Sequence, residues 1–143
     1  MEDQLRALAC IREHLGEGGR LVLNLFDPRL EMIVAHRGSL GASLKLHREF
    51  VHPETGRRVL VWDTRRYEPE EQMIRQYFVF EELDEDGRVV GKRFVPLVLR
   101  YLFRYEMEHL LSRSGFRVEA LYGDFQRGPF RSGGEQVWIA TRA

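Results

Sequence analysis

Hydrophobic residues recur at helical spacing in two places, and each time a glycine and an apolar strand follow. In the first place the side chains share one stripe, three or four residues apart: Leu5, Leu8, Ile11 and Leu15. The glycines within residues 16–19 end this predicted helix, and residues 20–26 form the predicted strand. The same order returns as a helix over residues 103–114, then Gly115, then a strand over residues 116–122. Helices that alternate with strands predict an α/β fold.

The first strand carries apolar side chains on both of its faces. They alternate as Leu21, Leu23 and Leu25 against Val22 and Phe26. This pattern is typical of a strand that helices cover on both sides of the sheet. Asn24 lies within this strand, and a buried amide must find hydrogen-bond partners. We therefore expect Asn24 to be buried and to mark a site.

Between the two helix–strand units the pattern changes to short strands joined by tight turns. The first strand begins at Ser43, and Leu44, Leu46 and Phe50 alternate along one of its faces. Further strands are predicted over residues 57–65, 73–83 and 88–95, with turns over residues 53–56 and 84–87. The four strands predict an antiparallel β-meander.

The C-terminal part completes the predicted architecture. Residues 123–135 form a glycine-rich loop, and residues 136–141 form a last strand. We predict a single domain in two parts, with an α/β core made of residues 1–28 and 99–143. Residues 29–98 are the inserted meander, with one or two helical turns at residues 30–35, and serve as a lid or an acceptor platform.

Composition and charge narrow the class of protein. The chain has 143 residues, enough for one core, with 43% hydrophobic and 31% charged residues, as in ordinary globular proteins. Twenty-two basic and 22 acidic residues cancel, so no strong field favours nucleic acid or an anionic membrane. Cys10 is the only cysteine, which excludes an intrachain disulfide. No signal peptide or membrane span is predicted, so we expect a cytoplasmic protein.

Three segments carry a resemblance to a known family. They are residues 11–23 (helix, glycine pair, strand), residues 108–118 (helix, Gly115, strand), and residues 122–125 together with Val137 to Ala140. In this order they resemble the C-terminal half of class I S-adenosylmethionine-dependent methyltransferases. The resemblance implies a partial Rossmann-like sheet with strands equivalent to the fifth, sixth and antiparallel seventh strands of that fold, interrupted by the meander.

The sequence departs from this family at the cofactor site. In the family a glycine-rich loop follows the first strand and lets the backbone approach the cofactor. Here residues 16–19 precede a strand, and no Lys-Ser or Lys-Thr follows them, which also excludes a phosphate loop. S-adenosylmethionine is therefore implied by the resemblance alone, and its main binding loop is expected to be missing from this truncated domain.

Candidate substrate-binding residues lie where ligands bind in open α/β sheets, beyond the carboxyl ends of the strands. They are Asn24, Phe26, Asp27, Arg100, Tyr101, Arg104, Tyr122 and Asp124. Turn or loop roles for Asp27 and Asp124 are the alternative. A second possible set lines an apolar acceptor pocket, although plain sheet core is favoured for it: Trp62, Tyr67, Tyr77, Phe78 and Phe80. No catalytic acid or base is nominated, and the five histidines show no metal-ligand spacing.

Two functions are compatible with these observations. One is the acceptor-side half of a methyltransferase, which aligns an unidentified, possibly small-molecule acceptor with the methyl group, and which is expected to be inactive alone. The other is a non-catalytic binding or dimerisation module that keeps the half-fold. Both leave the first strand with an unpaired edge, so we expect a homo-oligomer or a partner chain that pairs with it.

Overall fold

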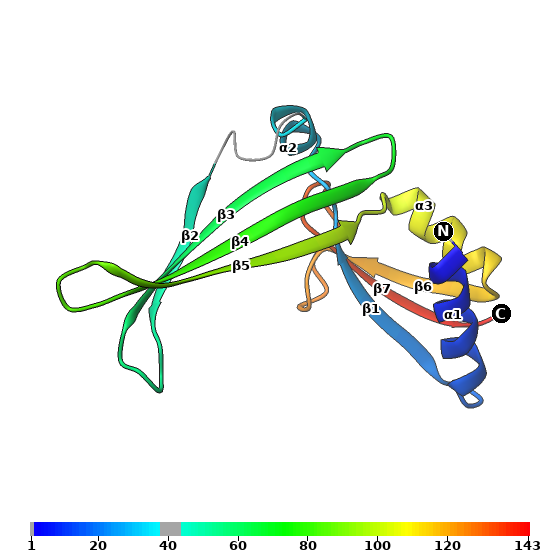
Figure 1. Ribbon diagram of the computed structural model, residues 1–143. Coiled ribbons are helices and arrows are strands. Elements are labelled where there is room, and N and C mark those ends of the chain that lie inside the picture. The colour runs from blue at the N-terminus through cyan, green and yellow to red at the C-terminus, as the bar shows by residue number, and fades with distance from the viewer. Residues whose placement is uncertain (1, 38–43) are drawn as a thin grey trace. The chain divides into compact units, whose positions relative to one another are not determined.

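The computed structural model describes residues 2–37 and 44–143; Ser43, the predicted start of the first meander strand, lies outside the described residues. It divides into two compact units. The α/β unit contains Met1–Leu30 and Tyr101–Ala143, and the meander unit contains Glu31–Arg100. Their elements, in chain order, are α1 (Glu2–His14), β1 (Arg20–Phe26), α2 (Leu30–Ala35), β2 (Lys45–Val51), β3 (Arg58–Glu68), β4 (Met73–Leu83), β5 (Val89–Arg100), α3 (Arg104–Arg113), β6 (Phe116–Tyr122) and β7 (Glu135–Arg142) (Figure 1). None of the described helices is long and apolar enough to span a membrane.

The α/β unit is built on a three-stranded sheet in the order β1-β7-β6. Strand β7 runs antiparallel to both of its neighbours, so β1 and β6 run in the same direction. Helices α1 and α3 lie on one side of this sheet (Figure 1). Their apolar faces and the sheet share one core: Leu8, Leu102, Met107, Leu110, Leu111, Phe116, Trp138 and Ala140. The unit is therefore a two-layer α/β structure, consistent with the partial Rossmann-like fold that the resemblance implied.

Local signals fix the ends of the helices in this unit. The backbone N–H of Gly19 donates to the carbonyl of Gly16 in the turn after α1, and β1 begins at the next residue. At the start of α3, the Glu106 carboxylate accepts the backbone N–H of Phe103 at 2.9 Å. Gly115 follows α3 with a φ of 78°, a left-handed conformation that glycine adopts without steric cost. The bounds predicted for β1 and β6 are confirmed.

The prediction that β1 is covered on both faces is wrong. Leu21, Leu23 and Leu25 pack against the core, whereas Val22 is 59% exposed and Asn24 is also exposed. The Asn24 amide donates to a Glu135 carboxylate oxygen at 3.3 Å. The reason is that α1 and α3 cover the same face, and an alternating strand buries only the side chains on that face. No strand of the described chain pairs with the second edge of β1.

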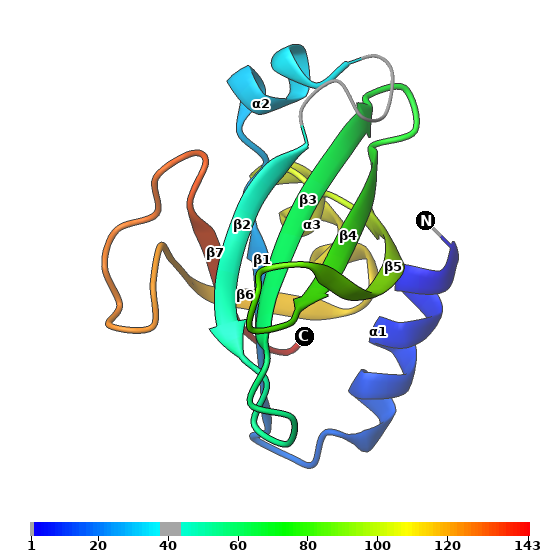
Figure 2. The same ribbon diagram turned by 60° about the vertical axis from the view of Figure 1, so that its left-hand side comes forward.

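The meander unit is a four-stranded antiparallel sheet in the order β2-β3-β4-β5 (Figure 2). Strands β3 and β5 extend beyond the predicted residues 57–65 and 88–95. Pairing of Met73 with both Glu68 and Arg100 extends the sheet to the ends of these strands. Strand β5 continues through Pro96, which is tolerated because β5 is an edge strand, where a residue without an N–H can be accommodated.

A bulge in β2 changes which side chains share a face. The pairing register shifts between Leu46 and Arg48. As a result Leu46 lies opposite Trp62 and Phe50 lies opposite Val59, which are on different faces of β3. The expectation that Leu46 and Phe50 share a face is therefore wrong, because one extra residue reverses the alternation.

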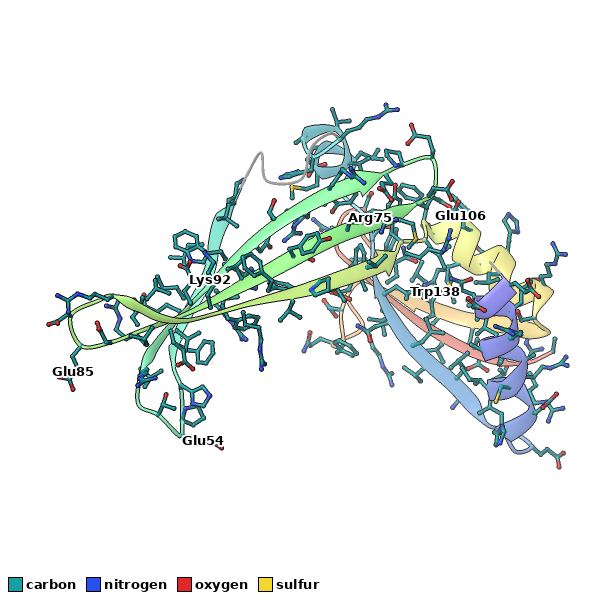
Figure 3. The ribbon with its side chains drawn as sticks, in the orientation of Figure 1. Glu54, Arg75, Glu85, Lys92, Glu106 and Trp138 are labelled. Carbon is teal, nitrogen blue, oxygen red and sulfur yellow. The ribbon has the colours of Figure 1, made fainter. Side chains whose placement is uncertain are left out.

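Three strands of the meander unit meet at one carboxylate, that of Glu81 on β4. Its two oxygens accept the Lys92 ammonium of β5 and the Trp62 indole N–H of β3, each at 2.8 Å (Figure 3 labels Lys92). The Lys92 bond above all, with the Trp62 bond, holds the pKa of Glu81 below its ordinary value against the effect of desolvation.

This lowered pKa predicts an acid-sensitive contribution to stability. Glu81 stabilises the fold fully above its unfolded pKa, and the contribution disappears as the pH falls through the lower folded pKa. We expect Glu81→Gln to remove about 1 kcal/mol or less at neutral pH, and to make the urea midpoint less dependent on pH below about pH 4.3. Glu85→Gln in the β4–β5 turn is the control, and an identical pH profile for both variants would contradict the prediction.

Candidate functional site

The carboxyl end of β1 carries a buried acid, Asp27, whose partners all lie in the α/β unit. Its carboxylate accepts the Ser132 hydroxyl at 3.0 Å, the Gly133 backbone N–H at 2.8 Å and the Gln136 amide at 2.7 Å. Its own backbone N–H donates to the Gly134 carbonyl at 2.7 Å. Asp27 therefore fastens the loop before β7 to the end of β1.

Gln136 continues this network into the core. It is fully buried, and its amide nitrogen donates both to Asp27 and, at 3.0 Å, to the backbone carbonyl of Leu102. Its oxygen accepts the indole N–H of Trp138 at 3.0 Å, and Trp138 is 1% exposed. Figure 3 shows Trp138 on the sheet of this unit. Every polar atom of the Gln136 side chain is thus paired, which is what a buried amide requires.

Asp124 also accepts hydrogen bonds from the backbone of its own loop. One of its carboxylate oxygens accepts the backbone N–H groups of Gln126 and Gly128, both at 2.8 Å. The half-buried Tyr122 forms an isolated bridge with Pro129 across the same loop. The geometry of Asp27 and Asp124 fits the turn and loop roles that the sequence left open, because their oxygens accept hydrogen bonds from their own surroundings.

The other predicted residues have diverse surroundings. Arg100 belongs to the meander unit and donates to the Glu71 carbonyl at 3.0 Å. Tyr101 is buried, with its ring edge-on to Phe103, and Phe26 is half-buried. The Arg104 guanidinium lies over the rings of Tyr105 and Phe130, 5.1 and 5.7 Å from their centroids. The role of these residues as acceptor contacts stays a prediction.

The meander unit holds a buried acid that the sequence analysis did not single out. Asp63 of β3 is 7% exposed, and the Gln76 amide of β4 donates to its carboxylate at 3.0 Å. The Arg65 guanidinium, two residues along the same face, also donates to this carboxylate. The signal was present in the sequence, since Val59, Val61 and Asp63 alternate and so share one face.

A cavity of about 240 Å³ opens beside Asp63. Its lining is polar and basic, with one carboxylate among several cationic or imidazole groups: Met32, His36, Lys45, Leu46, His47, Asp63 and Arg65. The His47 Nδ1 lies 3.8 Å from an Asp63 oxygen, and the His36 Nδ1 lies 3.0 Å from the Met32 carbonyl. These groups offer hydrogen bonds of both kinds to a small polar molecule, in surroundings that disfavour additional positive charge.

Comparison with known proteins gives matches by structure. No protein-family model matches the chain, and neither does any curated protein. The CcbJ methyltransferase of Streptomyces caelestis matches with a TM-score of 0.73 and 22% identity, over 99% of this chain and 54% of that chain. This chain has the fold of part of a methyltransferase.

Two other solved methyltransferases share this fold with the chain. The amino pentose methyltransferase CalS10 of Micromonospora echinaspora has a TM-score of 0.60 and 21% identity, over 97% of this chain and 50% of its own. The sugar N-methyltransferase KedS8 of a Streptoalloteichus species has a TM-score of 0.57 and 21% identity, over 96% and 48% of the two chains. The chain therefore spans about half the length of the methyltransferases it matches. The resemblance that the sequence indicated is confirmed at the level of the fold.

The described residues do not by themselves fit the cofactor of these methyltransferases. The glycines of residues 16–19 lie between α1 and β1, and the glycine-rich loop of residues 123–135 joins β6 to β7. No strand of the described chain leads through a glycine-rich loop into a helix, which is the arrangement that admits a nucleotide-like cofactor. S-adenosylmethionine thus finds no glycine cradle in this part of the chain.

The network around Asp27 predicts a large loss of stability when its carboxylate is removed. Asp27→Ala leaves the fully buried Gln136 amide without this acceptor, and it also removes the acceptor of the Ser132 hydroxyl and of the Gly133 N–H. We expect a loss of about 2–4 kcal/mol in the free energy of unfolding, measured by urea denaturation. Asn24→Ala, on the exposed face of β1, is the control and is expected to change it by about 0.5 kcal/mol or less. Equal effects of the two substitutions would contradict the structural role of Asp27.

Proposed function

We propose that this chain is the C-terminal, acceptor-side half of an S-adenosylmethionine-dependent methyltransferase that methylates an amino group of a small polar acceptor, such as an amino sugar. The observation that carries the proposal is the sheet β1-β7-β6, whose antiparallel last strand lies between two parallel strands, with the meander inserted in the sequence between β1 and β6. The solved structures that share this fold include an amino pentose methyltransferase and a sugar N-methyltransferase.

The cavity beside Asp63 is the proposed acceptor site. A methyl acceptor nitrogen must be uncharged to act as a nucleophile, because its lone pair forms the new bond. The Arg65 guanidinium offsets the Asp63 carboxylate, so the remaining positive charge of Lys45 disfavours an ammonium ion in the cavity and favours the neutral amine. The Asp63 carboxylate accepts a hydrogen bond from the amine N–H and fixes its orientation, which is the main task of the protein in an in-line transfer.

This proposal predicts binding of amino sugars that depends on Asp63. We expect D-glucosamine to bind at least about tenfold more tightly than D-glucose, and more tightly at about pH 9 than at about pH 6, where the amine is charged. Asp63→Asn is expected to abolish the preference for the amine, whereas Asp84→Asn in the β4–β5 turn preserves it. Calorimetric or NMR titration measures both constants. Equal affinities for the two sugars in the wild-type protein would overturn the assignment of this cavity.

The alternative function is a non-catalytic binding or dimerisation module, and the second edge of β1 favours it. This edge has no partner strand in the described chain, and an open edge presents unpaired N–H and C=O groups to another chain. Calorimetric titration of S-adenosylmethionine tests this alternative. A micromolar Kd would exclude the non-catalytic module, because such a module has no use for the cofactor.

We propose that the open edge of β1 pairs with a strand of another chain, and that its exposed face packs against that chain. The other chain is either a second copy or a partner that supplies the neighbouring strand. Val22 lies on that face and is 59% exposed. Light scattering on the purified chain is expected to give a mass above that of the monomer. Val22→Glu is expected to shift the protein towards the monomer without lowering the unfolding midpoint, since Val22 contributes little to the monomer core. A monomeric wild-type chain would contradict self-association, and a pull-down from the source cells then tests the partner chain.

A further inference from the structure

The meander unit contains a second and larger cavity, of about 600 Å³. Its floor is apolar and aromatic, with Phe50, Val59, Phe78, Phe80 and Val95 in its lining, and Arg93 also borders it. Cavities of about 300–1,000 Å³ with mostly apolar linings and a few polar groups are the usual sites for small organic ligands. Phe78 and Phe80 belong to the aromatic set for which the sequence left a pocket open, whereas Trp62 and Tyr77 lie on the opposite face of the sheet.

The strand register places two arginines on the face that carries this cavity; Arg93 lines the cavity, and Arg48 lies on β2 outside its lining. Arg48 of β2 pairs with Val61 of β3, Val61 pairs with Phe80 of β4, and Phe80 pairs with Arg93 of β5. Residues directly opposite each other in antiparallel strands share a face. Arg48 and Arg93 therefore flank Val61 and Phe80 on one face, and the Arg48 guanidinium lies 5.2 Å from the centroid of the Phe50 ring.

These two arginines differ from the other arginines of the meander unit. Each of the others donates to a carboxylate or a carbonyl of the unit: Arg37, Arg57, Arg58, Arg65, Arg66, Arg75, Arg88 and Arg100. Arg48 and Arg93 have no hydrogen-bonded or ionic partner among residues 2–37 and 44–143. The acid that lines the cavity, Glu82, is already paired with Arg57 at 3.4 Å. The cavity thus presents uncompensated positive charge beside an aromatic floor.

Gly91 keeps the cavity open at the β5 side. It lies opposite Glu82, in the same cross-strand row as Phe50 and Val59. A Cβ at Gly91 would approach the Glu82 side chain no closer than 3.5 Å, which is ordinary van der Waals contact. A larger residue therefore fits the backbone at this position and fills space that the glycine leaves empty.

We propose that this cavity binds a planar ring compound that carries an anionic group. The ring lies on the phenylalanine floor, and the anion pairs with Arg93, whose guanidinium group suits carboxylate and phosphate oxygens. Stacking of a ring on an aromatic floor and the charge-assisted contact with Arg93 act on different parts of the ligand, so neither part alone reproduces the full affinity. This inference does not depend on methyl transfer or on the cavity beside Asp63.

The probe for this site is 1-naphthyl phosphate, titrated into the whole chain and followed by the methyl NMR signals of Val59, Val61 and Val95. We expect it to bind at least about tenfold more tightly than either inorganic phosphate or 2-naphthalenemethanol, which carry only the anion or only the ring. Titration of 1-naphthoate distinguishes a carboxylate ligand from a phosphate ligand. Equal binding of 1-naphthyl phosphate and 2-naphthalenemethanol would overturn the role of Arg93.

Three substitutions locate the binding. Arg93→Gln is expected to weaken 1-naphthyl phosphate at least about fivefold, and Gly91→Val is expected to abolish binding by filling the cavity. Arg75→Gln removes an arginine from the opposite face of β4 and is expected to leave the affinity unchanged. Thermal unfolding of each variant shows whether it folds. Arg93 lies at the surface, so Arg93→Gln is expected to fold, and it decides the test should Gly91→Val fail to fold. Unchanged affinity in folded Arg93→Gln would refute the site.

Discussion

The α/β unit depends on one chain of buried hydrogen bonds, from the Trp138 indole through the Gln136 amide to the Asp27 carboxylate. It joins the middle strand of the sheet to the end of β1, and through the Leu102 carbonyl to the segment that leads into α3. In a buried, low-dielectric place such a network is favourable only when every member is paired. This network therefore fixes the positions of β1, β7 and the start of α3 relative to one another. The Asp27 carboxylate also holds the loop before β7.

In the meander unit a single face of the sheet carries most of the chemistry. Asp63 and its cavity lie on the same face of β3 as Val61, which belongs to the row between Arg48 and Arg93. The opposite face instead carries the Glu81 carboxylate that links β3, β4 and β5. Both faces carry paired charges, but the two cavities proposed as ligand sites lie along the face of Asp63, Phe80 and Arg93.

The sequence predicted the elements well where the signal is local. The glycines around α1 and α3 and the apolar run of residues 20–26 gave the right strands, because turn chemistry and alternation act over a few residues. Burial depends instead on which layers surround a strand, so Asn24 was placed wrongly inside. Asp63 was missed because its contact with Gln76 comes from the pairing of β3 with β4, although Arg65 lies two residues away on the same strand. The role of Asp27 likewise depends on Gln136, far away in the chain.

The edges of the two sheets are protected to different degrees. Strand β5 contains Pro96, which offers no N–H, and β2 is interrupted by a bulge after Leu46. Strand β6 has a bulge after Val118, next to the charged Glu119. Strand β1 pairs with β7 in unbroken register and has neither proline nor bulge. When the protein is concentrated or refolded, aggregation by strand pairing is therefore expected at the open backbone edge of β1. Substitutions in β1 are the first choice for keeping the chain soluble.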